Sequence, residues 1–166
     1  MTVVAVNTFT HSVTYVSDQM LRSLKRIIMW SGLDPNKLIS GWDSTDRALR
    51  TWLEGYYLKR VVLEIYDPKN GELVTRWDAV INYSYGTGDG EMWVDTDAIR
   101  HAIKKAGAIP SECDYCILLE TASGAPDVPG WGSTTYRSTD GFVRHSVGTT
   151  IGTHAIGTDF GYWRKR

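Results

Sequence analysis

The 166-residue sequence lacks the features that would place it in several specialised classes of protein. It contains only two cysteines, too few for a disulfide framework. No apolar run reaches the roughly 18 residues of a membrane span, and no basic segment followed by an apolar run marks an export signal. The formal net charge of −1 gives no electrostatic reason to expect nucleic acid or an anionic membrane as a partner. We therefore expect a cytoplasmic protein that binds neither directly.

The composition that remains is typical of a folded globular protein. Hydrophobic residues make up 42% of the chain, and seven Trp and nine Tyr carry large apolar surfaces that need a place to pack. A chain of this length can bury a core as one unit, because domains commonly run roughly 100 to 200 residues. We predict a single domain over residues 1–166, divided into an N-terminal segment (1–10), a core (11–120) and a C-terminal segment (121–166).

Two amphipathic helices are predicted at the start of the core. From His11 to Ser31, apolar residues recur every three or four positions, and Gly32 follows as a stop signal. Residues 43–58 repeat this pattern, with Asp43 or Ser44 as the N-terminal cap.

The period then changes to that of strands. Residues 60–67 and 72–85 are rich in β-branched and aromatic residues, and the Asn-Gly turn between them predicts a β-hairpin. A third helix is predicted over residues 94–107 with Asp95 as its cap, and a strand over residues 113–121. The order α, α, β, β, α, β indicates an α+β fold with the helices packed on one face of a sheet.

The C-terminal segment is different in kind. Gly, Thr and Ser occupy 20 of its 46 positions, yet a structureless loop of that length is uncommon in a compact domain. Disorder is disfavoured by the large apolar residues spread along it, which are Trp131, Tyr136, Phe142, Val143, Val147, Ile151, Phe160, Tyr162 and Trp163. We expect short strands and turns, with glycines where the chain bends, that could pack on a neighbouring element in more than one way.

An ordered series of motifs along essentially the whole chain resembles the bacterial HORMA domain family, the smaller prokaryotic relatives of the eukaryotic spindle-checkpoint and meiotic-axis HORMA proteins. The motifs are "FTHSVTYVSDQMLRSLKRII", "SGLDPNKL", "RTWLE", "VVLEIYDP", "LVTRWD", "MWVDTDAIRHAIKKAG", "YRSTDG" and "GYWRKR". The resemblance implies a core of three helices on a β-sheet, followed by a mobile C-terminal safety belt. Residues 121–166 lie where that belt is expected.

The resemblance also implies a function without catalysis. Members of the family are encoded in antiphage signalling operons of the CBASS type, beside a cGAS/DncV-like nucleotidyltransferase and an AAA+ remodelling ATPase. The HORMA protein closes around a closure-motif peptide and then binds and activates the nucleotidyltransferase, and the ATPase opens it again. By this resemblance the chain is a signalling adaptor that needs no cofactor, with a second HORMA protein as a further possible partner.

Three stretches of the chain would carry this function. An extended peptide can add itself to the exposed edge of a sheet, and the candidate edge strand contains Asp114, Tyr115, Cys116, Ile117, Leu118, Leu119 and Glu120. The belt side chains expected to pack are Trp131, Tyr136, Phe142, Val143, Ile151, Phe160, Tyr162 and Trp163. The handle that the ATPase would grip is the N-terminal run Thr2, Val3, Val4, Ala5, Val6, Asn7 and Thr8.

Signals for metal, redox or phosphate chemistry have simpler explanations. Cys113 and Cys116 have CxxC spacing, but they enter an apolar strand rather than a helix N-terminus, and no second pair completes a zinc site. Residues 86–90 form a Gly-rich loop without the lysine of a phosphate-binding loop. An acidic group that does not fit calcium-loop spacing consists of Asp89, Glu91, Asp95 and Asp97. We predict a flexible loop and a solvated surface here.

Signals for hydrolytic catalysis are equally weak. Ser138, Asp140 and His145 are close in sequence, but no nucleophile elbow is present and a mobile segment cannot orient a triad. Three further histidines are scattered along the chain, at His11, His101 and His154. The basic end, 164–166, is expected to be a solvated tail. The alternative that stays open is a small α+β hydrolase or ligand-binding protein with the C-terminal segment as a lid.

Overall fold

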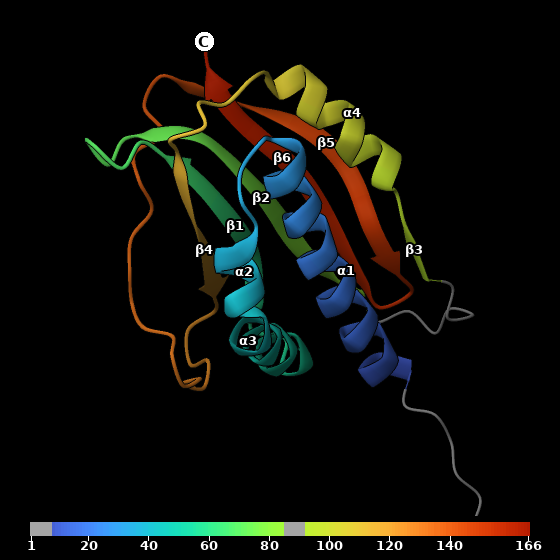
Figure 1. Cartoon of the computed structure of the whole chain (residues 1–166). Helices are drawn as coiled ribbons and strands as arrows, with labels where there is room; N and C mark the ends of the chain where they lie inside the picture. Colours follow the sequence, from blue (N-terminus) through green and yellow to red (C-terminus); the bar gives the residue numbers. More distant parts are fainter. Residues whose placement is uncertain (1–7, 85–91) are drawn as a thin grey trace, which may run out of the picture.

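The computed structural model describes residues 8–84 and 92–166. In this part of the chain a six-stranded antiparallel sheet carries the helices on one face (Figure 1). The helices are α1 (Thr8–Trp30), α2 (Asn36–Ser40), α3 (Trp42–Glu54) and α4 (Thr96–Ala106). The strands are β1 (Leu58–Tyr66), β2 (Leu73–Tyr83), β3 (Met92–Val94), β4 (Asp114–Thr121), β5 (Phe142–Thr153) and β6 (Ile156–Lys165). They lie in the order β3-β5-β6-β2-β1-β4.

The first predicted helix is confirmed as α1, although it begins three residues earlier than expected. Its apolar stripe extends by one turn because Phe9 packs against the core and stacks on Tyr56, with ring centroids 4.8 Å apart. Gly32 stands just beyond its end with φ +89°, a conformation that favours glycine. No helix in the described ranges is long and apolar enough to cross a membrane.

The second predicted helix is confirmed as α3, but both predicted ends are wrong. Gly41 stands at the cap position and makes no side-chain bond, so neither Asp43 nor Ser44 caps the helix. The helix ends at Glu54, and Tyr56 lies beyond it at φ +63° with its side chain 44% exposed. The short helix α2, which precedes α3 directly, was not predicted because five residues carry no periodic signal.

The central hairpin and the third predicted helix agree with the sequence analysis. β1 and β2 pair in antiparallel fashion, and Gly71 closes the turn at φ +73° with its N–H donating to the Asp67 carbonyl. In α4 the Asp95 carboxylate accepts a hydrogen bond from the Ala98 N–H at 3.0 Å, as a helix cap does.

The C-terminal segment is more regular than predicted. Instead of short strands it forms a long hairpin, β5 and β6, that inserts between β2 and β3 and completes the sheet. Thr121 belongs to β4, so the segment proper begins at residue 122. Ile151, Ile156 and Phe160 are at most 1% exposed and belong to the core that the helices cover. The alternation of apolar residues therefore favours long strands here, despite the many Gly and Thr residues of the segment.

Candidate functional site

The strand β4 lies at one edge of the sheet, with β1 as its hydrogen-bonded neighbour. After β4 the chain turns near α3 and then runs back past the open side of the strand before β5 begins (Figure 1). Among the described residues, no backbone hydrogen bond joins β4 to residues 132–136. The outer edge of the strand is therefore separated from the returning chain rather than paired with it.

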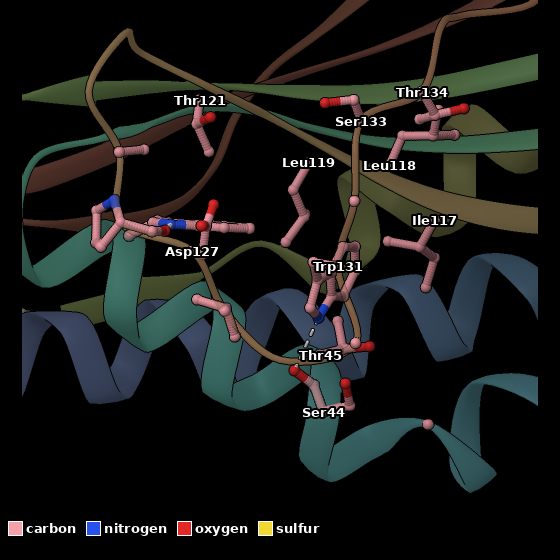
Figure 2. A pocket seen from close by; sticks show the side chains of 17 residues that line it. Ser44, Thr45, Ile117, Leu118, Leu119, Thr121, Asp127, Trp131, Ser133 and Thr134 are labelled. Atoms are coloured by element: carbon pink, nitrogen blue, oxygen red, sulfur yellow. Dashed lines mark hydrogen bonds between the residues drawn. The ribbon is translucent and has the colours of Figure 1, made fainter.

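A cavity of about 620 Å³ lies between this edge, α3 and the returning chain. Figure 2 shows Ile117 and Leu119 projecting from β4 toward α3, with Trp131 entering the same space from the C-terminal segment. Further lining residues are Ser44, Thr45, Trp52, Leu118, Thr121, Asp127, Ser133 and Thr134. The space follows the strand, so it fits an extended chain better than a compact small molecule.

The returning chain forms the outer wall of this cavity, and its first part, residues 126–131, is hydrogen-bonded to α3. The Trp52 indole N–H donates to the Pro126 carbonyl at 2.7 Å, and the Trp131 indole N–H donates to the Ser44 carbonyl at 3.3 Å. The two indoles meet edge to face with centroids 6.1 Å apart. Val128, which lies between Pro126 and Trp131 in the chain, is buried. These contacts hold residues 126–131 at a defined distance from β4.

A smaller and more apolar cavity of about 180 Å³ adjoins the first one at the beginning of β4. Leu38, Ile117 and Trp131 supply its apolar lining. Tyr115 closes one side, because its hydroxyl donates to the Asp34 carbonyl at 2.7 Å and accepts from the Leu38 N–H. Burial raises the pKa of the Tyr115 phenol, so the group stays neutral. This cavity fits one aliphatic or aromatic side chain.

A third cavity of about 410 Å³ lies at the other end of β4. Glu120 and Leu118 line it from the strand, and Tyr136 with the hydroxyl residues before it lines it from the returning chain. The Tyr136 hydroxyl donates to Glu120 at 2.9 Å, and the Arg76 guanidinium lies 4.3 Å from the Tyr136 ring centroid. Burial and this bond to a carboxylate raise the pKa of the Tyr136 phenol. At this end the apolar side chains of Leu118 and Leu119 therefore lie beside the carboxylate and hydroxyl groups.

The predicted site residues do not all lie at this site. The seven strand residues form β4, and Trp131 and Tyr136 line the cavities beside it. The other belt residues lie instead in the β5–β6 hairpin, where they build the sheet and its core: Phe142, Val143, Ile151, Phe160, Tyr162 and Trp163. Residues 2–7 of the predicted handle lie outside the described residues, and its last residue, Thr8, is the first residue of α1.

The helical wall of the site was not predicted from the sequence. Leu38, Ser44 and Thr45 come from α2 and the first turn of α3 and line the cavities. A polar pair opening a helix is read from sequence as a cap, and only the packing of α3 beside β4 turns it toward the cavity. No sequence signal distinguishes the two roles.

In the part of the chain that the structure describes, the residues that suggested hydrolytic or redox chemistry do not come together in a site. The Asp140 N–H donates to the Ser138 hydroxyl, while His145 stacks on Tyr162 in the sheet. Cys113 and Cys116 are free thiols, and burial raises the pKa of both. The Gly-rich loop at 86–90 lies outside the described residues. Within the described ranges no three His, Cys, Asp or Glu side chains are grouped to hold a metal ion.

Comparison with solved structures identifies the fold. A chain of the mitotic checkpoint complex superposes with a TM-score of 0.77 at 12% identity, covering 93% of this chain and 99% of that one. Caenorhabditis elegans HTP-2 bound to the HIM-3 closure motif superposes at 0.70 with 11% identity, covering 99% of both chains. A chain of the Escherichia coli MS115-1 CdnC:HORMA-deltaN complex superposes at 0.61 with 12% identity, covering 100% and 94%.

These likenesses show that the predicted α+β architecture is the HORMA fold, with the short α2 as a fourth helix in the described part of the chain. No curated protein matches the sequence. The model of one family, described as Bacterial HORMA domain 2, matches residues 1–166. The chain therefore belongs to the bacterial HORMA domain 2 family.

Proposed function

We propose that this protein is a signalling adaptor that binds an extended peptide along the outer edge of β4. The observation that carries the proposal is the cavity of about 620 Å³ between this unpaired edge and the returning chain. Residues 122–166 act as the safety belt, which covers the peptide and anchors itself on the far side of the sheet through β6. The solved complex of HTP-2 with a closure motif supports the class of ligand.

Main-chain pairing explains how such a peptide would bind. The outer N–H and C=O groups of an edge strand accept an added strand, whose side chains then point alternately to the two faces of the sheet. Along β4, Ile117 lines only the cavities next to α3 and Glu120 lines only the cavity near Tyr136, whereas Leu118 and Leu119 line cavities of both kinds. Alternate side chains of the peptide are therefore expected to enter the space beside α3 and the space beside Tyr136, with apolar residues against Leu118 and Leu119.

The path of the belt explains why release would be slow. The chain leaves β4, passes outside the bound peptide and joins β2 through eight residue pairs of β6. A peptide enclosed in this way leaves only if that hairpin detaches or the peptide slides out lengthwise. An AAA+ remodelling ATPase that pulls on the N-terminal segment would supply the work, and residues 2–7 are the proposed handle.

The proposed partner of the peptide-bound form is a cGAS/DncV-like nucleotidyltransferase in antiphage signalling. The solved CdnC:HORMA complex from Escherichia coli supports this partner class. The adaptor itself carries out no chemistry in this proposal, and its output is the conformation that it presents to the enzyme.

The experiment is a selection of phage-displayed random 12-residue peptides on the full chain, followed by binding measurements on variants. Neighbouring residues of a strand point their N–H groups in opposite directions, so one of Ile117→Pro and Leu118→Pro removes an outward donor. We expect at least tenfold weaker binding of the selected peptide by that variant. Trp93→Pro, in β3 at the opposite edge of the sheet, is the matched control.

The proposal fails if both β4 variants fold, by circular dichroism, and bind the selected peptide with unchanged affinity. It also fails if only small molecules, and no peptides, protect the C-terminal segment from proteolysis, because a lid over a ligand site then explains the cavity better.

A further inference from the structure

Two carboxylates are buried on the back face of the sheet, the face opposite the helices. Glu64 on β1 and Asp78 on β2 are 0% and 1% exposed. A buried carboxylate without a partner of opposite charge is strongly destabilising, so the groups that neutralise it determine which conformations are favourable. For both carboxylates, the shortest ion pairs come from arginines of the belt.

The first ion pair joins Glu64 to Arg137, just beyond the cavity wall. The Arg137 guanidinium donates to one carboxylate oxygen at 2.7 Å, and its backbone N–H donates to the other at 2.8 Å. The same side chain donates to the Gly71 carbonyl at 2.9 Å and lies 3.6 Å from the centre of the Tyr66 ring. One residue of the belt is thus attached at once to β1 and to the β1–β2 turn.

The second ion pair joins Asp78 to Arg144 across an intervening strand. Two guanidinium nitrogens of Arg144 lie 2.9 and 2.8 Å from one carboxylate oxygen, and the Trp163 indole donates to the other at 2.8 Å. Arg144 is on β5, so it must cross β6 to reach β2. It crosses at Gly161, where an added Cβ would overlap the guanidinium. The absence of a side chain at this position opens the route.

We propose that these two ion pairs form an ionic latch, in which Arg137 and Arg144 are positioning residues that set how readily the belt detaches from the back face. Carboxylates suit a reversible contact, because they are paired when the belt is docked and hydrated when it is not. Asp78 also keeps the neighbouring core arginines Arg76 and Arg60, at 3.5 and 4.0 Å, when the belt arginine is withdrawn. An apolar patch in the same place would be left exposed to water after detachment.

The latch depends on the belt alone and makes no use of a peptide. Its test is therefore hydrogen–deuterium exchange of the full chain without added ligand, comparing β6 with the core helix α1. The variants are Arg137→Gln, Arg144→Gln and Gly161→Ala, of which the last blocks the crossing without removing a charge. Arg50→Gln is the matched control, because it breaks the Asp46 ion pair on α3 and leaves both latch ion pairs in place.

We expect amides of β6 to exchange at least tenfold faster in the three latch variants, with exchange in α1 unchanged and the control like wild type. Arg137→Lys, which keeps the charge but loses the second guanidinium contacts, should fall between Arg137→Gln and wild type. Unchanged exchange in β6 overturns the latch. Equal acceleration in β6 and α1 also overturns it, because the ion pairs then stabilise the whole fold and do not control the belt. A failed peptide selection would leave this result unaffected.

Discussion

Single glycines in the C-terminal hairpin leave room for large side chains that lie flat across the strands. Gly161 lets Arg144 pass over β6, and Gly152 lies beneath the Trp93 ring, whose nearest atom would be 2.6 Å from an added Cβ. Neither glycine has a positive φ, so the space above each residue, and not its backbone freedom, is what requires glycine. This is a different use of glycine from the turn at Gly71.

Replacement of Gly152 by alanine tests this role. Gly152→Ala should lower the free energy of unfolding by about 1 kcal/mol, the low end for overpacking, because Trp93 is 42% exposed and its ring can move aside. Urea denaturation measures the loss. In the Trp93→Ala background the same substitution should cost little, and a cost that persists there would mean that something other than the ring resists the methyl group.

Asp114, at the start of β4, predicts a pH dependence of stability. Burial alone would raise its pKa, but the Tyr115 N–H and the Lys37 and Tyr66 side chains bond to the carboxylate and lower the pKa below its ordinary value of 3.8. A lowered folded-state pKa means that the stabilisation is complete above the unfolded-state pKa and is lost as pH falls through the folded one. The Asp114→Asn variant lacks it at every pH.

The difference in the free energy of unfolding between wild type and Asp114→Asn should therefore be constant from pH 7 to about pH 5 and shrink below about pH 4. Urea denaturation at pH 7, 5 and 3 measures it. If the difference is the same at pH 3 as at pH 7, the carboxylate charge is not what holds the start of β4 to α2 and β1.

At the scale of elements, the β5–β6 hairpin belongs to the core as well as to the belt. Its buried residues lie under the helices, and Tyr162 packs against Trp77 of β2 with centroids 5.2 Å apart. In the connection before it, residues 122–141, only Val128 is a buried apolar residue of the core. Core formation thus rests mainly on the hairpin, whereas the peptide capture that we propose rests on the connection before it.

Truncation of the chain after Ser123 should consequently prevent stable folding. It removes three apolar side chains that are at most 1% exposed, Ile151, Ile156 and Phe160, each stabilising by roughly 1.5–3 kcal/mol, against a total stability of about 5–15 kcal/mol. It also uncovers β2. Thermal unfolding followed by circular dichroism is expected to lose its cooperative transition. A truncated chain that melts cooperatively would show that the first 123 residues are an independent core.

At the scale of the whole molecule, peptide retention and forced release are predicted to depend on different ends of the chain. Deletion of residues 2–7 removes no residue of α1, so a selected peptide should dissociate at the wild-type rate. With the AAA+ ATPase and ATP present, release from the full chain should accelerate while release from the shortened chain does not. Fluorescence anisotropy of the labelled peptide measures both. Equal acceleration for the two chains would mean that the handle lies elsewhere.

The sequence by itself determined the local structure, because the signals for it lie within a few residues of each other. The stripe of α1, the Asp95 cap, the Asn-Gly turn and the strand that became β4 all follow from short-range patterns. The ends of α3 were mispredicted, because Gly41 was not recognised as the start when polar residues stood nearby. The three helices and the central hairpin were therefore predictable.

Only the tertiary structure decided which strand the C-terminal hairpin joins. Pairing with β2 brings Arg144 within reach of Asp78, 66 residues away, and lets Arg137 meet Glu64, 73 residues away. Taken alone in sequence, each of these charges resembles an ordinary polar position of a strand or a loop. Likewise, Ser44 faces a cavity only because α3 packs beside β4. Contacts between distant residues depend on how the sheet closes, and no short-range pattern encodes that choice.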